Sequence, residues 1–405
     1  MGAPDISSTD AALPQLTAEE LRRFSRHLIL PEFGQTAQRR LKASSVLLIG
    51  LGGLGSPAAL YLAAAGVGRI GLVDADVVEE SNLQRQIIHG HSVLGKLKAE
   101  SAESRMLDLN PGLVIERHDV RFGIDNALDL ISRYDVIIDG TDNFPTRYLV
   151  NDACAKLGKP NVFGSVLRFD GQLSVFDARY GPCYRCLFPE PPPAELSMNC
   201  SEAGVLGVLP GVIGSLQATE AIKILSGIGT PLIGRMLIYD GLDLSFNTID
   251  IFKAADCPAC SPKGLAAPLK ETPMVCAAPV GQSISGAALQ ARLGNGEDLL
   301  VVDVRNPVEW AQGMIAGAIG LPKANLDHLL ADPGVHPLPK GQDIVLVCQS
   351  GMRSNAAIKA LQSAGYDVNH LYNLDLGMAA WTGSTQPPEA LETPFHLNTL
   401  ANQSN

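Results

Sequence analysis

The turn Gly50-Leu51-Gly52-Gly53-Leu54-Gly55 has the glycine spacing of a phosphate-binding loop. The apolar run at 45–49 predicts a buried strand before it, and the Ala- and Leu-rich segment 57–65 predicts a helix after it. Glycines let the backbone approach a phosphate, and a helix N-terminus presents unpaired N–H groups to an anion. The residues expected to contact a nucleotide here are Gly50, Gly52, Gly53 and Gly55.

An acidic residue, Asp74, follows a second expected strand at 69–73. A carboxylate about 20 residues beyond such a turn can hold the hydroxyl groups of a ribose. The combination predicts a nucleotide site without saying which nucleotide binds. A nicotinamide-dependent oxidoreductase is therefore one candidate function.

Two Cys-x-x-Cys pairs, Cys183–Cys186 and Cys257–Cys260, lie far apart in the chain. Such turns can place four thiolates (Cys183, Cys186, Cys257 and Cys260) tetrahedrally around Zn²⁺. Because four thiolates leave no open coordination position, we expect a structural zinc rather than a catalytic one. Two redox-active pairs or unliganded thiols are the alternative interpretation.

Two other cysteines have surroundings that suit a nucleophile. Cys200 precedes a glycine-rich run and an expected helix, and a thiol near helix N–H groups has a lowered pKa. Cys348 follows an apolar strand expected at 344–347 and opens a helix. An inert, packed thiol is the alternative for Cys200, and Cys154 is expected in the core.

Composition excludes several classes of protein. The chain has 405 residues, enough for two or three domains, and 46% of them are hydrophobic. The net charge of −11 argues against a nucleic-acid binder. We expect no membrane span and no signal peptide, because no apolar run is long enough and the N-terminus lacks basic and apolar regions. The eight cysteines are too sparse for a disulfide scaffold and suit a reducing cytoplasm.

The elements that position these residues alternate between strand-like and helix-like segments, which predicts an α/β fold with a mostly parallel sheet. Thr17 and Glu20 have the spacing of a capping box for a helix that continues through His27. Strands are expected at 45–49, 69–73, 113–116, 135–139, 236–239, 299–303 and 344–347, extended structure at 162–176, and helices at 211–225 and 354–363.

Composition shifts divide the chain into two domains. The expected organisation is a flexible tail at 1–15, a Rossmann-like mixed-sheet domain at 16–262, a linker at 263–282, a smaller α/β domain at 283–392 and a second tail at 393–405.

The first domain contains five motifs in a fixed order: the glycine turn, Asp74-Ala75-Asp76, Ser81-Asn82-Leu83-Gln84-Arg85-Gln86, Gly95-Lys96-Leu97-Lys98-Ala99 and Thr141-Asp142-Asn143. Together they resemble the adenylating enzymes that activate ubiquitin-like proteins, in particular the MoeB/ThiF adenylyltransferases. The resemblance implies that ATP is the nucleotide. Asp74 would then hold its ribose, Arg85 and Lys98 would neutralise its phosphates, and Asn82 would help to place them.

The same resemblance assigns further roles. Asp142 would hold Mg²⁺, with Asn143 beside it in nucleotide binding. Arg26 resembles an arginine that relatives supply across the interface of a homodimer. Cys200 resembles the cysteine that some activating enzymes use covalently, and relatives carry the same paired cysteines for zinc.

The second domain resembles a rhodanese, a sulfurtransferase domain, through its loop Cys348-Gln349-Ser350-Gly351-Met352-Arg353-Ser354 and the segments 303–310 and 317–322. Loop N–H groups and the helix dipole would stabilise a thiolate or persulfide at Cys348. The Cys-x4-Arg spacing favours a bound sulfur atom over phosphate. Met314 departs from the family, which often has His there, and Asp303 and Arg305 are expected to be structural hydrogen-bonding residues.

Together the resemblances imply a cytoplasmic enzyme, expected to be a homodimer, that uses ATP, Mg²⁺ and Zn²⁺. It would adenylate the C-terminal glycine of a ubiquitin-like sulfur carrier ending in Gly-Gly. Sulfur from a Cys348 persulfide, supplied by thiosulfate or a cysteine desulfurase, would then give the carrier thiocarboxylate, as in molybdenum-cofactor synthesis. The alternatives are a rhodanese domain that only docks partners and the oxidoreductase named above.

Overall fold

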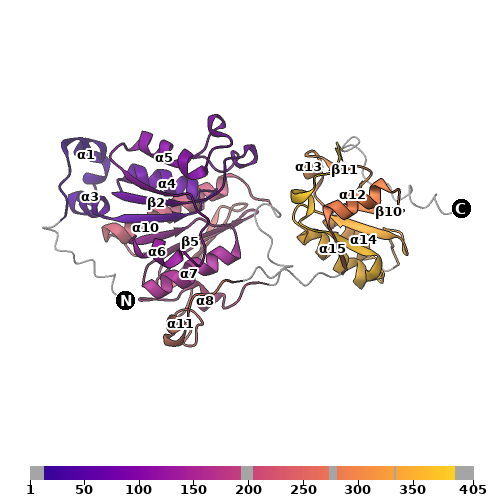
Figure 1. Cartoon of the computed structure of the whole chain (residues 1–405). Helices are drawn as coiled ribbons and strands as arrows, with labels where there is room; N and C mark the ends of the chain where they lie inside the picture. The colour runs from indigo at the N-terminus through magenta and orange to yellow at the C-terminus, as the bar shows by residue number, and fades with distance from the viewer. Residues whose placement is uncertain (1–12, 193–203, 273–280, 333, 388–405) are drawn as a thin grey trace. The chain divides into compact units, whose positions relative to one another are not determined.

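The computed structural model describes residues 13–192, 204–272, 281–332 and 334–387 (Figure 1). These residues form two compact units, one of residues 13–192 and 204–272 and the other of residues 281–387 except 333. Cys200, Cys276, residues 1–12 of the expected first tail and the whole expected second tail lie outside the described residues.

The first unit is built on an eight-stranded sheet in the order β3-β2-β1-β4-β5-β6-β7-β8. Strands β1 to β5 pair in parallel, and β5 to β8 pair antiparallel, so the sheet is mixed as predicted. The strands are β1 Ser45–Ile49, β2 Arg69–Val73, β3 Val114–His118, β4 Val136–Asp139, β5 Asn161–Leu167, β6 Asp170–Phe176, β7 Arg235–Asp240 and β8 Ser245–Asp250.

Helices cover both faces of this sheet (Figure 1). Alternate side chains of a strand point to opposite faces, so Val46 and Leu48 pack with α3, α4, α5 and α10, whereas Leu47 and Ile49 pack with α6 and α7. Because both faces are buried, β1 is apolar from Val46 to Ile49. The helices are α3 Gly34–Ala43, α4 Gly55–Ala65, α5 Lys98–Leu109, α6 Ala127–Ser132, α7 Phe144–Leu157, α8 Tyr184–Leu187, α10 Val208–Ser226 and α11 Pro262–Ala266.

The N-terminal helix differs from the prediction. The capping box is present, because Thr17 Oγ1 accepts the Glu20 N–H and Glu20 accepts the Thr17 N–H. The expected helix is nevertheless broken into α1 Ala18–Arg23 and α2 Ser25–Leu28. Phe24 leaves helical geometry at the break and is buried against Gly66, where a side chain would collide with its ring.

Two further elements bear on the predictions. Among the described residues, α10 alone has the length and composition of a membrane-crossing helix, but 50% of that stretch is buried and it packs against α4 and β5. We therefore interpret α10 as a core helix. The expected linker begins with ordered structure, since its first residues belong to helix α11.

The second unit contains a five-stranded parallel sheet in the order β12-β10-β13-β14-β9 and an antiparallel pair, β11 and β15. Strands β10 and β13 lie centrally and carry buried valines and leucines to both faces. Its elements are β9 Gln282–Ile284, α12 Gly286–Gly294, β10 Leu299–Asp303, α13 Pro307–Trp310, β11 Met314–Ile315, β12 Ile319–Gly320, α14 Lys323–Leu330, β13 Asp343–Val347, α15 Met352–Ser363, β14 Leu371–Leu374 and β15 Thr385–Gln386.

A buried ion pair links β10 to the loop after α13. Arg305 donates from Nε to Asp303 Oδ1 at 3.0 Å and from Nη2 to Asp303 Oδ2 at 2.7 Å. The same Nη2 donates to the Gly313 carbonyl at 2.7 Å, and both charged residues are only 1% exposed. These contacts agree with the expected structural role of the pair.

Arg305→Met should destabilise the second unit by about 3–5 kcal/mol, because it leaves the Asp303 carboxylate buried without its counter-charge. Denaturant unfolding of the full chain, followed for the transition of this unit, measures the loss. The double variant Asp303→Asn with Arg305→Met removes the unpaired charge and should recover part of the stability. A single variant as stable as the wild type would contradict this account.

Candidate functional site

The glycine turn lies at the C-terminal edge of the parallel strands. Strand β1 lies between β2 and β4, and the helices that follow β1 and β4 cover opposite faces of the sheet. This is the switch point at which open α/β sheets bind ligands. Gly50 has φ +91°, and a Cβ there would lie 2.9 Å from the Gly140 carbonyl oxygen. The first position of the turn thus requires glycine.

Asp74 is pinned to this turn. Its Oδ2 accepts the Leu51 N–H at 2.8 Å, and its Oδ1 accepts the Asp76 N–H at 2.9 Å. Burial raises the pKa of Asp74, although both N–H groups favour the charged form. A carboxylate has about four acceptor sites, so Asp74 can still accept bonds from ribose hydroxyls.

The predicted phosphate-binding cations lie on segments that pack over the turn. Lys98 begins α5 and its Nζ lies 2.9 Å from Asp76 Oδ2. The Lys98 side chain is 8% exposed and that of Asp76 is 74% exposed, so an arriving phosphate can replace this partner. Arg85 donates to the Ser81 carbonyl at 3.1 Å, and its Cγ would lie 3.6 Å from a Cβ on Gly53.

Asn82 and Asn143 are held by local bonds. Asn82 is buried and its Oδ1 accepts the Glu79 N–H at 3.2 Å, which fixes the segment that carries Arg85. Asn143 is the N-cap of α7, where its Oδ1 accepts the Thr146 N–H at 3.0 Å. The Asn143 amide group still has its N–H donors for a nucleotide.

Asp142 is exposed directly after β4, beside the glycine turn, and fits a Mg²⁺ ligand by its chemistry. The preceding turn is rigid, because Asp139 Oδ1 accepts both the Thr141 N–H at 3.0 Å and its hydroxyl at 2.6 Å. Burial raises the pKa of Asp139. The Asp139 carboxylate thus holds the turn, and the Asp142 carboxylate is exposed.

Arg26 is not brought to the glycine turn within one chain. It is exposed on α2, next to Phe24, which packs at Gly66 beyond the C-terminal end of α4. The glycine turn lies at the other end of this helix, roughly 16 Å away along its axis.

His89 belongs to this site and was missed in the sequence. Its Nε2 lies 3.1 Å from the Leu51 carbonyl oxygen, and its Nδ1 lies 3.0 Å from Ser101 Oγ. Burial lowers the pKa of His89. The available signal was its place within the polar segment between Asn82 and Lys98.

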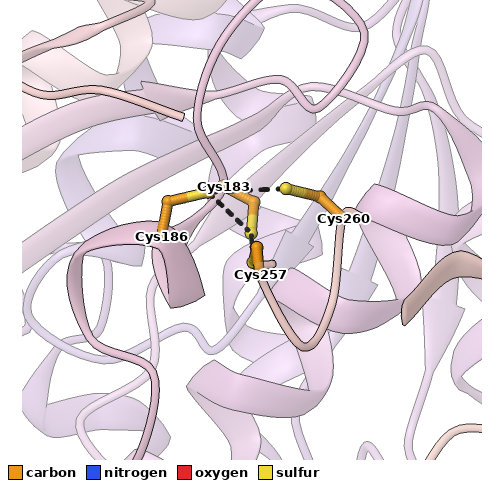
Figure 2. Close-up of side chains that lie close together, drawn as sticks. All are labelled: Cys183, Cys186, Cys257 and Cys260. Atoms are coloured by element: carbon orange, nitrogen blue, oxygen red, sulfur yellow. Dashed lines mark hydrogen bonds between the residues drawn. The ribbon is translucent and has the colours of Figure 1, made fainter. Parts of the chain in front are cut away.

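The four paired cysteines converge in space (Figure 2). Their Sγ atoms are separated by 3.5 Å between Cys183 and Cys257, 3.4 Å between Cys186 and Cys260, and 3.9 Å between Cys183 and Cys186. All four sulfurs lie within 4.8 Å of one another. A tetrahedral site with Zn–S bonds of about 2.3 Å has sulfurs about 3.8 Å apart. The cluster therefore has the dimensions of a metal site.

Without a bound cation, the four thiols cannot all be ionised together. Hydrogen bonding with Cys186 and with the other two thiols raises the pKa of Cys183 well above its usual range. Four thiolates this close repel one another unless a cation binds them, and a metal ion displaces the protons. The donor set therefore fits a metal ion such as zinc.

Cys348 lies fully buried at the end of β13, in the loop that leads into α15. The Gly351 N–H donates to its Sγ at 3.1 Å, and Ser354 Oγ lies 3.3 Å from the same sulfur. Gly351 has φ +90°, which turns its N–H toward the sulfur. The Gly351 N–H thus offers a hydrogen bond to a sulfur anion, whereas the Ser354 hydroxyl has a shorter bond to Asn373 Oδ1, at 2.6 Å.

Arg353, which follows the Cys348 loop, forms an ion pair with Glu309 on another helix. Arg353 donates to Glu309 on α13 through both terminal nitrogens, at 2.6 and 2.7 Å. Burial alone would raise the pKa of Glu309, but the hydrogen bonds and charge of Arg353 hold it below its usual value. The pair anchors the loop to α13.

Comparison with protein families decides the identity of the first unit. A family model described as "ThiF family" matches residues 24–259. The chain belongs to the ThiF family. A second model, described as "Rhodanese-like domain", matches residues 285–384 of this ThiF-family chain.

The ThiF-family chain is also similar to curated proteins along most of its length. It is 45% identical over 385 residues to the "Probable adenylyltransferase/sulfurtransferase MoeZ" of Mycobacterium tuberculosis, covering 92% of this chain and 95% of that protein. It is 42% identical over 388 residues to the "Adenylyltransferase and sulfurtransferase MOCS3" of Drosophila yakuba, covering 92% and 85%. Our ThiF-family protein is thus an enzyme of the adenylyltransferase and sulfurtransferase class.

A solved structure supports the fold. The crystal structure of E. coli MccB with ATP matches 59% of this ThiF-family chain and 74% of MccB, with a TM-score of 0.53 and 20% identity. Membership of this family implies adenylation with ATP, in place of the oxidoreductase function considered above.

The purified ThiF-family chain should retain a tightly bound metal ion, and Cys257→Ser should abolish its retention. The variant should also lose several kcal/mol of stability, because metal binding at such a site contributes directly to folding. Elemental analysis after gel filtration and thermal unfolding measure the two effects. Cys154→Ala, at a buried thiol outside the cluster, is the control and should keep the metal. Metal retained by Cys257→Ser would refute the assignment.

Proposed function

We propose that this enzyme adenylates the C-terminal carboxylate of a ubiquitin-like sulfur carrier and then converts it to a thiocarboxylate with sulfur carried on Cys348. The observation that carries the proposal is that one chain contains both a nucleotide edge lined by Lys98, Arg85 and Asp74 and a buried thiol that receives hydrogen bonds in a rhodanese loop. The relatives named as carrying both activities support it.

In the first step, a carboxylate oxygen of the carrier attacks the α-phosphorus of ATP and pyrophosphate leaves. Negative charge crowds this transition state, so positioned cations are the main source of catalysis. Lys98 and Arg85 bind the phosphates, Asn82 fixes the Arg85 segment, and Asp74 holds the ribose. Asp142, beside Asn143, would hold Mg²⁺, which supplies further positive charge to the phosphates when bound.

In the second step, the terminal sulfur of a Cys348 persulfide attacks the acyl carbon, and AMP leaves with the electron pair of the broken bond. The carrier is then joined to Cys348 through an acyl disulfide. A second thiol, proposed to be Cys200, attacks the Cys348 sulfur and releases the thiocarboxylate. This step leaves a disulfide that an external thiol must reduce. Thiosulfate or a cysteine desulfurase persulfide supplies the sulfur.

An exposed apolar surface next to the nucleotide edge suits the carrier. We call it the docking surface. Its turns are tied together, since the Gly241 N–H donates to the Phe169 carbonyl at 2.8 Å and the Leu206 N–H to the Arg168 carbonyl at 3.1 Å. Gly207 packs so tightly against Gln84 that a side chain would collide with it, which places this surface beside the Arg85 segment. Its members are Leu167, Phe169, Leu206, Val208, Leu242, Leu244 and Phe246.

Several finer assignments complete the proposal. The metal at the four cysteines would be a structural zinc, and a reducing cytoplasm would keep its ligands reduced. The domain boundaries would follow the predicted ones. Since Arg26 lies at the far end of α4 in its own chain, it would serve the site only from the other subunit of a homodimer.

The central test incubates the full chain with ATP, Mg²⁺, thiosulfate and a panel of carriers from molybdenum-cofactor, thiamine, cysteine and tRNA-thiolation pathways. Intact mass should show one carrier exchanging oxygen for sulfur. Lys98→Ala should slow adenylation by about 10²–10³-fold, because it removes a cation that faces the transition state. Cys348→Ala should keep adenylation and lose the thiocarboxylate.

The controls separate the alternatives. Cys154→Ala removes a buried thiol of the first unit, outside the sulfur-transfer loop, and should behave as wild type. Thiocarboxylate formed by Cys348→Ala would mean that the rhodanese domain only docks partners. If no carrier is adenylated or thiolated, the proposed function is wrong.

The docking surface makes a separate prediction. Leu242→Asp, at a 69% exposed position, should weaken carrier binding about tenfold or more, because a charge replaces a large apolar side chain at the interface. Titration with the carrier identified above measures the change. Val114→Asp, at a 55% exposed position on β3 at the opposite edge of the sheet, is the matched control. Equal effects of both variants would argue against this surface.

A further inference from the structure

We infer that His89 is a positioning residue that fixes the glycine turn to the start of α5. It thereby keeps Asp74 and Lys98 at the spacing at which they bind the ribose and the phosphates of ATP. The inference rests on the adenylation step proposed above and deepens it. Neither a charge nor direct contact with the nucleotide is required of His89. Its part is to fix the backbone that the nucleotide contacts.

Leu51 is the point that His89 fixes. This residue lies between Gly50 and Gly52, in the segment whose backbone must approach the phosphates. Its N–H donates to Asp74 at 2.8 Å, and its carbonyl oxygen lies 3.1 Å from His89 Nε2. Both backbone polar groups of Leu51 are thus held by side chains from other elements, which fixes its peptide planes.

The bonds continue around a closed circuit. Asp74 accepts the Asp76 N–H at 2.9 Å, and the Asp76 carbonyl accepts the Lys98 N–H at 2.9 Å. Lys98 opens α5, and Ser101 one turn later lies 3.0 Å from His89 Nδ1. This closed set of hydrogen bonds therefore connects the Asp74 carboxylate, the glycine turn and the segment that carries Lys98.

The acceptors define the form of the imidazole. A carbonyl oxygen only accepts, so Nε2 must carry the hydrogen that it donates to Leu51. In the neutral ring Nδ1 then accepts the Ser101 hydroxyl hydrogen. Burial lowers the pKa of His89, and although the hydrogen bond with Leu51 raises it, the nearby charge of Lys98 lowers it further. Neutral His89 thus fits both of its partners.

Asn110, in the same unit, makes hydrogen bonds comparable with those of His89 and serves as a control position. Asn110 Nδ2 donates to the Ala63 carbonyl at 3.0 Å, near the C-terminal end of α4, and its Oδ1 accepts the Gly112 N–H at 3.3 Å. Asn110 and His89 are each 7% exposed. Both residues therefore anchor a backbone carbonyl from a buried position with two bonds, but only His89 does so at the nucleotide edge.

The test measures ATP binding to the full chain with Mg²⁺ by calorimetry, alongside thermal unfolding. His89→Leu should weaken ATP binding about tenfold, the scale of one lost buried hydrogen bond. His89→Gln, whose amide N–H can replace the Nε2 donor, should restore most of the affinity. Asn110→Leu should lower the melting temperature comparably and leave ATP affinity unchanged.

Each outcome decides the inference. Wild-type affinity in His89→Leu, or equal weakening in Asn110→Leu, would overturn it while leaving the proposed function intact. Failure of the wild-type chain to bind ATP would overturn the proposed function and this inference with it. If His89→Leu does not fold, Ser101→Ala provides a second test, because it removes the bond to His89 Nδ1. This variant should weaken ATP binding about threefold, roughly half the effect of His89→Leu on a free-energy scale. Unchanged ATP binding in Ser101→Ala would contradict the inference.

Discussion

The close crossing of two backbones at Gly50 and Gly140 is the constraint on which the nucleotide edge depends. A Cβ at either residue would come within 3 Å of the other residue's carbonyl oxygen, at 2.9 and 2.7 Å. This approach lets β1 and β4 end together while their helices leave on opposite faces of the sheet. The turn and the Asp142 segment therefore meet at one edge of the sheet. Bulkier residues would separate the two halves of the site.

Buried and half-buried polar side chains then fix the backbone turns around this crossing. Asp74 and His89 hold the glycine turn from the sheet side and the α5 side, and Asp139 holds the Thr141 turn. Each of these side chains faces backbone groups that would otherwise be unpaired in a water-poor environment. The groups left exposed, such as Asp142, are those free to meet a ligand.

Much of this arrangement follows from local sequence signals. Strands such as β1 and β10 are short apolar runs with both faces covered, so the sequence predicts their bounds well. The four-cysteine cluster also follows in part from spacing, because each Cys-x-x-Cys turn brings its own two thiols together. The break at Phe24 could not be predicted, since it depends on tertiary packing at Gly66. His89 was hidden for the same reason: its partners, Leu51 and Ser101, become neighbours only in the fold.

The four-cysteine cluster has a consequence for how the chain matures. A metal ion that joins Cys183 and Cys186 to Cys257 and Cys260 closes a long loop, and that loop contains α10, β7 and β8. During synthesis this closure must wait until Cys260 has left the ribosome, long after the parallel strands are complete. Strands β7 and β8 would then be secured after the rest of the sheet.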